Sequence, residues 1–267
     1  MASSTRQSLA TASAALQPLL AKADLAFAQQ LFAVAGAVSN SAQLRNLLSD
    51  PSAEAGAKAG AAQAVFGKVI AADALDFVTS LVALRWSRGS DLVSAIQDLA
   101  VQVVAALAAK SGKLEALEGE LFTFQQAVEG DSALQFALAN QQATLEARTA
   151  LVNKLLAGNA TAEGALLITE ALGAAKHERY SHVLERFGKL VSAAAKRAVA
   201  KVTVASELSA AQQERLSSAL SKQYGLAIKL NLQVDPSIIG GVRVQIADEI
   251  IDGSLVSRLQ QAKLQLA

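Results

Sequence analysis

Near its end the chain carries a run in which large apolar residues alternate with small or polar ones. The apolar positions are Leu226, Ile228, Leu230, Leu232 and Val234. Because successive side chains of a β-strand point to opposite faces, this spacing places all five on one face. The run therefore predicts a half-buried strand, and a second alternation over residues 242–246 predicts another.

Turn-forming residues separate and follow these strands. Pro236 has no N–H group for a strand ladder, and Gly240 and Gly241 can take positive φ, so the chain is expected to reverse there. Residues 247–249 are predicted to form a hairpin loop. After the returning strand, Gly253 is expected to turn the chain into a last, leucine-bearing helix.

The order of these turn residues is specific. The run DPSIIGGVRVQIADEIIDGS over residues 235–254, with the short helix after it, resembles the C-terminal end of the δ subunit of F-type ATP synthases. This is the family of the oligomycin-sensitivity-conferring protein. The likeness continues upstream through residues 202–214, and residues 1–9 and 86–93 look like the long δ subunits of actinobacteria. The family usually has glycine where this chain has Ala247.

Composition favours helices in the rest of the chain. Apolar residues make up 52% of the sequence but aromatic ones only 4%, a balance that suits alanine- and leucine-rich helices better than a β-sandwich. A net charge of +1 offers no strong field for gathering nucleic acid or an anionic membrane, so binding must depend on shaped surfaces. The absence of cysteine excludes disulfides and is compatible with the cytoplasm.

No stretch is predicted to span a membrane. The longest uncharged run lies between Asp24 and Arg45, and polar residues leave only 31–38 continuously apolar. A bilayer requires roughly 20 such residues. Residues 1–23 are serine-rich and lack acidic residues, as a transit peptide would, but they carry only two basic residues, and we expect a first helix of the mature protein.

The helical part contains an internal repeat. Leu31-Phe32, Ala37-Val38 and Leu44 recur 90 residues later as Leu121-Phe122, Ala127-Val128 and Leu134. After a slip of one residue, an Arg-x-Ser-x-apolar spacing that starts at Arg88 recurs at Arg179. Alanine-leucine helices also resemble each other by composition, but composition does not produce a shared spacing at a constant offset. We therefore expect one helical unit to have been duplicated.

The predicted fold is mainly α with a C-terminal α+β domain. It consists of tandem duplicated helical bundles followed by a small mixed sheet with two helices. The expected domains are residues 1–109, 110–199 and 200–267. The last boundary lies where helical spacing stops near Val199 and strand alternation begins. The order strand, helix, strand, hairpin, helix is typical of α+β domains.

The chain offers no convincing set of catalytic residues. His177 and His182 are the only histidines, and five residues apart on a helix they cannot share a metal ion as an i, i+4 pair could. The carboxylates Asp248, Glu249 and Asp252 are interpreted as turn residues rather than an acid/base pair or a cation site. With no phosphate loop or dinucleotide fingerprint, we predict no catalytic, metal or cofactor-binding residues and no nucleotide binding.

Two further features are interpreted as structural. Lys196, Arg197 and Lys201 form a basic cluster without interleaved aromatic residues, so a solvated helix end is favoured over a nucleic-acid surface. Trp86, the only tryptophan, is expected to pack between helices, although an interface anchor is the alternative.

The resemblance implies a structural function. Such a chain would be a stator subunit, one copy per complex, which joins the peripheral b-type stalk to the catalytic head of a proton-translocating ATP synthase. The implied partners are the α subunits of the head and the b-type stalk subunit, with no nucleic acid and no direct membrane span. The implied location is the cytoplasmic side of the bacterial plasma membrane, where the chain would be peripheral through the complex.

Candidate partner-binding residues follow from the same resemblance. Phe27, Leu31 and Phe32 lie in a segment similar to the family's first-helix motif, which usually begins with tyrosine. Which bundle copy engages the head stays open. The alternative functions are a carboxylate-based hydrolase and a basic-helix protein that binds nucleic acid or a membrane surface.

Overall fold

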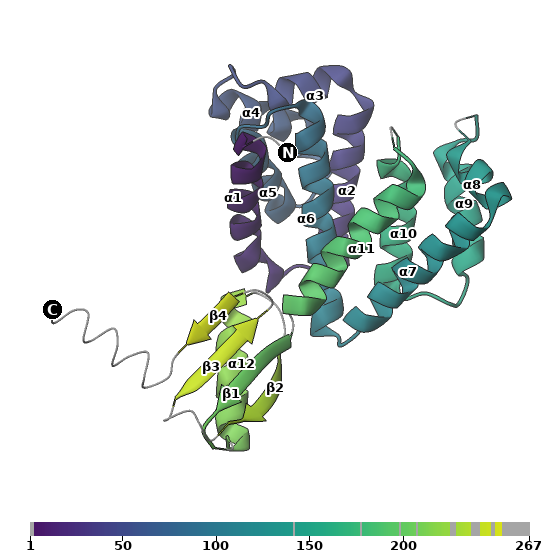
Figure 1. Ribbon diagram of the computed structural model, residues 1–267. Coiled ribbons are helices and arrows are strands. Elements are labelled where there is room, and N and C mark those ends of the chain that lie inside the picture. Colours follow the sequence, from purple (N-terminus) through teal and green to yellow (C-terminus); the bar gives the residue numbers. More distant parts are fainter. Residues whose placement is uncertain are drawn as a thin grey trace. The chain divides into compact units, whose positions relative to one another are not determined.

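A computed structural model (Figure 1) describes residues 3–140, 142–176, 178–197, 199–206, 208–224, 228–235, 241–246 and 249–252. The chain divides into two compact units, Met1–Ser192 and Ala193–Ala267. Helices make up the described part of the first unit, and a four-stranded sheet with a helix follows in the second. The predicted class, mainly α with a C-terminal α+β domain, is therefore confirmed.

The described chain begins with six helices, the last of which is largely buried. They are α1 (Ser3–Leu20), α2 (Leu25–Asn40), α3 (Ala42–Ser49), α4 (Ala55–Phe66), α5 (Ala72–Ala83) and α6 (Gly89–Lys110). α6 packs against α1, α2 and α3, and its side chains are buried at nearly every position from Leu92 to Ala108. α6 is thus the central helix of the core.

By length and composition α6 could also cross a membrane. It is the single described helix that passes this test, and 78% of its most apolar window is buried inside the protein. Core helices of soluble proteins meet the same criterion. Asp98 interrupts the apolar sequence of α6, so this helix contains no long charge-free run.

Five more helices complete the first unit. They are α7 (Leu114–Gly130), α8 (Ser132–Ala139), α9 (Leu145–Leu156), α10 (Ala162–Ala174) and α11 (Tyr180–Arg197). A shift of 90 residues carries α3 onto α8 and α4 onto α9 end to end, and carries the start of α5 onto the start of α10. α6 and α11 start 91 residues apart, which is the predicted slip. The duplication is confirmed in the helix boundaries.

A tertiary hydrogen bond is also repeated. The Ala71 N–H donates to Gln30 Oε1 at 2.8 Å, which ties α2 to the start of α5. Ninety residues later the Thr161 N–H donates to Glu120 Oε1 at 2.9 Å, and the Thr161 hydroxyl donates to Glu120 Oε2 at 2.8 Å. Similar composition alone would not reproduce a bond between the same two positions, so the two copies share a packing plan.

The two copies overlap in α6. The shift of 90 residues places α1 on residues 93–110, which are the last part of α6. α6 therefore closes the first copy and also opens the second, and α10 of the second copy packs against α6 and α2. This shared helix explains why residues 1–192 form one compact unit. Independent folding of residues 1–109 and 110–199 stays a prediction.

The second unit contains β1 (Val199–Val204), α12 (Ala210–Tyr224), β2 (Lys229–Val234), β3 (Val242–Ile246) and β4 (Glu249–Asp252). The strand order is β2-β1-β3-β4. β1 pairs with β2 in parallel and with β3 antiparallel, and β3 pairs with β4 antiparallel, so the sheet is mixed as predicted. Ile228, Val244 and Ile246 are buried, in agreement with the alternation.

The turn predictions are partly covered by the described residues. Gly241 has φ of 93°, the positive value expected of it. Pro236, Gly240, Gly253 and the last helix lie outside the described residues. The predicted hairpin loop was one residue too long. Ile246 pairs with Glu249, which leaves two residues between the strands and makes Glu249 the first residue of β4.

Candidate interaction surfaces

The three predicted partner-binding residues lie in the core. Phe27 is 7% exposed, Leu31 is 0% and Phe32 is 4%. The ring centroid of Phe27 lies 6.1 Å from that of Phe77, and Phe32 lies 6.0 Å from Phe187 of α11. These side chains hold α2 against its neighbours. Direct contact with a partner was implied by resemblance alone and stays a prediction.

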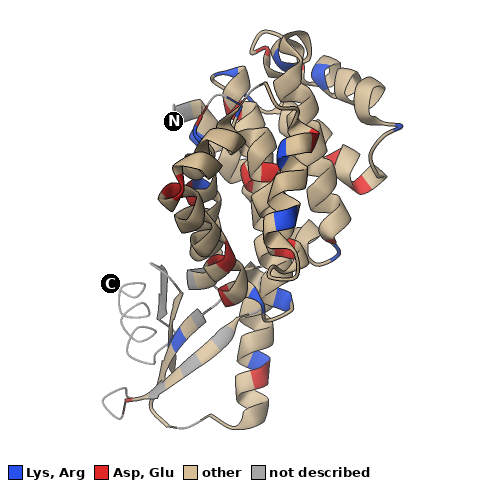
Figure 2. Cartoon of the chain, turned by 90° about the vertical axis from the view of Figure 1, so that its right-hand side faces the viewer, with Lys and Arg blue, Asp and Glu red and all other residues tan. Residues whose placement is uncertain are grey.

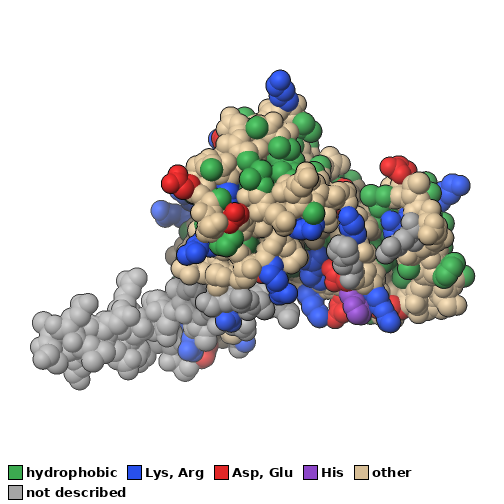
Figure 3. All heavy atoms as spheres, turned by 90° about the horizontal axis from the view of Figure 1, so that it is seen from above, with side chains coloured by type: hydrophobic (Ala, Val, Ile, Leu, Met, Phe, Trp, Pro, Cys, Tyr) green, Lys and Arg blue, Asp and Glu red, His purple; other side chains and the backbone are tan. Residues whose placement is uncertain are grey.

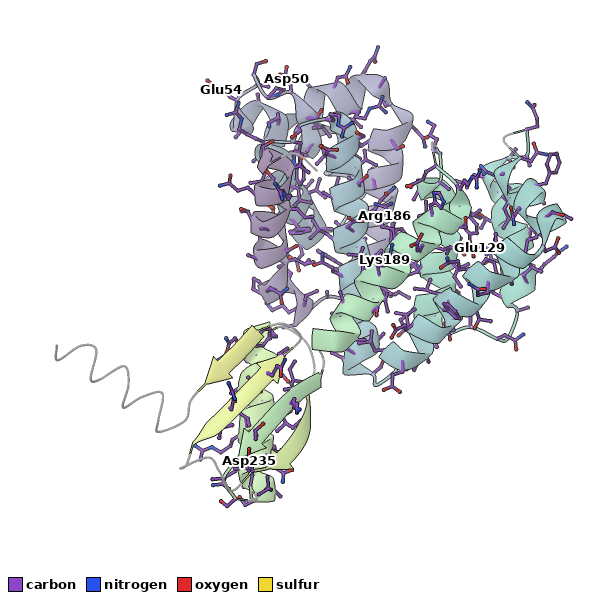
Figure 4. All side chains as sticks on the ribbon, viewed as in Figure 1. Asp50, Glu54, Glu129, Arg186, Lys189 and Asp235 are labelled. Carbon is purple, nitrogen blue, oxygen red and sulfur yellow. The ribbon has the colours of Figure 1, made fainter. Side chains whose placement is uncertain are left out.

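A polar junction joins α11 to α6. Arg186 Nη1 lies 2.8 Å from Asp98 Oδ1, and Arg186 Nη2 donates to Gln97 Oε1 at 3.0 Å. Glu178 lies 3.7 Å from the same guanidinium. Figure 4 labels Arg186 on α11. The junction ties the last helix of the second copy to the central helix of the first.

Burial dominates the ionisation of this junction. The Asp98 side chain is 8% exposed, and burial raises its pKa to about 6, although Arg186 opposes the shift and Glu178 adds to it. On α10, burial raises the pKa of Glu170 to about 7. Sequence reasoning missed both groups. The available signal for Asp98 was a single carboxylate inside an otherwise apolar helical run.

Two grooves open on the helical unit. The first has a volume of about 550 Å³ and is lined by Ser4, Gln7, Ser8, Thr11, Pro51, Leu84, Arg85, Trp86 and Ser87. The second has about 450 Å³ and is lined by Ser39, Arg45, Arg88, Gly89, Ser90, Val93, Ser94, Gln97, Ala174, Lys176 and Glu178. The first lining is rich in hydroxyl groups, and the second carries three basic side chains and one carboxylate. Neither lining brings together a nucleophile and a base.

The residues singled out for chemistry remain scattered. Among the described residues there is no group of three or more histidines and carboxylates that could hold a metal ion. His182 is exposed on α11, and His177 lies outside the described residues. Trp86 is 3% exposed and its Nε1–H donates to the Leu81 carbonyl at 2.9 Å, which confirms the packing role predicted for it.

The described residues include only part of the acidic cluster at 248–252 and of the basic cluster at 196–201. Glu249 and Asp252 lie in β4 by their backbone, Asp248 is outside the described residues, and Lys201 is exposed on β1. Lys196 and Arg197 lie at the end of α11, and their side chains are among those not described. Lys and Arg are scattered among Asp and Glu over the described part of the chain (Figure 2), and charges of both signs mix with hydrophobic side chains on the face drawn in Figure 3.

The sequence of this chain is similar to a known protein family. The family model of the ATP synthase delta (OSCP) subunit matches residues 101–266. The match starts inside α6 and continues through the second copy and the sheet unit.

Full-length relatives carry the same name. This chain is 38% identical to the ATP synthase subunit delta of Pseudarthrobacter chlorophenolicus over 100% of both chains. It is 41% identical to that of Kineococcus radiotolerans, over 90% of this chain and 87% of the relative. It is 40% identical to the ATP synthase subunit delta of Streptomyces avermitilis, over 90% of this chain and 88% of the relative. The chain therefore belongs to the ATP synthase delta (OSCP) subunit family, the peripheral-stalk subunits of F-type ATP synthases.

Proposed function

We propose that this chain joins the b-type peripheral stalk to the α subunits of the catalytic head, one copy per complex, and contributes no chemistry of its own. The observation that carries the proposal is the likeness to delta subunits over the whole chain. Rotor torque would turn the head unless the head were tied to the membrane part. The chain would therefore act on the cytoplasmic side of the bacterial plasma membrane, peripheral through the complex.

The helical unit suits a connection that must not slip. α6 is shared by both copies, so a displacement of one copy would have to disturb the core of the other. The Arg186–Asp98 pair and the Phe32–Phe187 contact add two further ties between the copies. Close-packed interiors transmit strain rather than absorbing it.

We infer that the second copy takes the family's ordinary place at the head. The family match extends from residue 101 to residue 266, so it takes in the second copy and the sheet unit. The first copy would then add a further contact or extend the reach of the stator. Phe27, Leu31 and Phe32 would affect partner binding through the packing of α2, since all three are buried.

Affinity purification from detergent-solubilised membranes tests the proposal. A tagged chain is expected to bring the α, β and b-type subunits with it in constant proportions. Replacing residues 111–267, a change that leaves α6 intact, by an unrelated folded domain of similar size should abolish this recovery. Recovery of the tagged full chain without head or stalk subunits would refute the stator function.

The hydrolase alternative is tested on the isolated chain. Titration calorimetry with Mg-ATP is expected to give no binding heat, because the sequence contains no phosphate-cradling motif. Micromolar binding or turnover of the nucleotide would contradict a purely structural role.

A further inference from the structure

Equivalent helices of the two copies bury different amounts of their surface. α2 buries two neighbouring stripes. The first contains Phe27, Leu31, Val34 and Val38, and the second contains Ala28, Phe32 and Ala35. α7 buries only the counterpart of the first stripe, which contains Leu117, Leu121, Phe124 and Val128. The counterparts of the second stripe are not buried on α7: Phe122 is exposed, and Glu118 and Gln125 are half-buried.

Helices of the second copy cover the second stripe of α2. Phe187 of α11 lies 6.0 Å from Phe32, between ring centroids, and α10 packs along α2. Lys176, just after α10, donates to Asn40 Oδ1 at 3.1 Å at the end of α2. In Figure 1, α11 runs diagonally next to α6 and α10. The covering helix α11 is amphipathic and carries basic residues such as Arg186 and Lys189 (Figure 4).

The open counterpart on α7 has a distinct character, and we call it the α7 stripe. It contains Glu115, Glu118, Phe122, Gln125 and Glu129, at the i, i+3, i+7, i+10 and i+14 positions of one helix face. Phe122 is 62% exposed, whereas its counterpart Phe32 is 4% exposed. Carboxylates precede and follow Phe122 along the stripe, and no Lys or Arg occurs in α7. A single aromatic ring thus lies between acidic groups.

We propose that the α7 stripe binds a positively charged amphipathic helix from another subunit of the complex. Phe122 would enter the apolar face of that helix, as Phe32 meets Phe187 in the first copy. Its Lys and Arg side chains would pair with Glu115, Glu118 and Glu129. Contact with water explains the exposed carboxylates. It does not explain an exposed phenylalanine at the position equivalent to Phe32, which is covered by α11 in the first copy.

Charge complementarity selects this occupant. A helix bearing acidic residues beside its apolar face would place like charges opposite the stripe, which is unfavourable. The inference rests on the proposed function, since it takes the partner to be a subunit of the same complex. It adds a contact on α7, a helix whose outer face has no other assigned role.

Photo-crosslinking in the assembled complex tests the inference. A benzoylphenylalanine at position 122 is expected to crosslink to a segment of another subunit that is helical, amphipathic and net basic, as identified by mass spectrometry. Benzoylphenylalanine at position 32 is the matched control and should crosslink within the chain, to α11. Crosslinking from position 122 only within this chain, to a second copy of it, or to an acidic or non-helical segment would overturn the inference.

Affinity measurements provide a second readout. A peptide with the crosslinked sequence should bind the isolated full chain, and Phe122→Glu should weaken it on the order of tenfold. Thr123→Glu, an exposed change on the same helix but off the stripe, should have little effect. Changing Glu115, Glu118 and Glu129 to Gln should weaken binding and flatten its salt dependence. Equal affinities for Phe122→Glu and Thr123→Glu would refute the stripe.

The two proposals fail in different ways. If head and stalk subunits copurify with the tagged chain but position 122 gives no crosslink to another subunit, the stator function stands and the α7 stripe does not. If those subunits fail to copurify, the stator function itself is refuted.

Discussion

Removing Arg186 should destabilise the helical unit in a strongly pH-dependent manner. In Arg186→Leu, Asp98 stays buried on α6 without its cation, and burial already raises the pKa of Asp98 to about 6 in the parent. Loss of the guanidinium should raise that pKa further. The carboxylate of Asp98 then either stays ionised without a partner or takes up a proton, and both outcomes lower the free energy of unfolding.

The sign and size follow from the raised pKa. Asp98 has a folded-state pKa above its unfolded value of 3.8, so its favourable contribution is complete at low pH and is lost as pH rises through about 6. At pH 5 Asp98 is mostly protonated in parent and variant alike, and the difference should be small. At pH 7.5 protonating a group with a pKa near 6 costs about 2 kcal/mol. The free energy of unfolding of Arg186→Leu should therefore be lower than that of the parent by about this amount.

Urea unfolding followed by far-UV circular dichroism at pH 5 and pH 7.5 measures this loss. The control is Lys189→Leu on the same helix, since its pair with Glu185 is exposed and should show no pH-dependent loss. The double variant Asp98→Asn/Arg186→Leu should lose the pH dependence. An equal loss at both pH values in Arg186→Leu would show that lost packing, not the stranded carboxylate, is responsible, and would refute the reasoning.

Three more outcomes are expected. Gly241→Val should destabilise the sheet unit by about 1 to 3 kcal/mol, because φ of 93° strains a β-branched residue, and an unchanged melting temperature would contradict this. Glu170→Gln should stabilise the helical unit by up to about 3 kcal/mol at pH 8 and not at pH 4. The pKa of Glu170 is raised from 4.5 to about 7, so the free energy that its buried carboxylate costs the folded state grows as pH rises through that interval. Equal effects at both pH values would count against this prediction. A fragment of residues 89–197 should unfold cooperatively when followed by circular dichroism, whereas a fragment of residues 111–197, which lacks α6, should not. Equal cooperativity of the two fragments would mean that the second copy does not need the shared helix.

Local patterns in the sequence determined a large part of this structure. The period of two over 226–234 and again over 242–246 predicted β2 and β3, because side-chain direction in a strand depends only on position. The constant offset predicted the duplicated helices, and the turn chemistry predicted the positive φ of Gly241. The motif over 235–254 pointed to the family, since turn residues in a fixed order are specific.

Tertiary structure alone decided which surfaces are buried. Phe32 and Phe122 occupy equivalent positions in the two copies, each directly after a leucine, yet one is 4% and the other 62% exposed. The difference comes from α11, which reaches α2 from more than a hundred residues away and covers it. The prediction of Phe27, Leu31 and Phe32 as partner contacts could not take this covering into account.

Long-range pairing also decided the sheet and the core. β2 and β3 are consecutive in the chain but do not pair, because β1 lies between them. Asp98 and Arg186 are separated by 88 positions and meet only because both copies pack on α6. The sequence alone predicts periods, turns and repeats, since these depend on near neighbours. The partners of each face depend on how whole helices and strands compete to bury apolar surface, and that competition is settled only when the chain has folded.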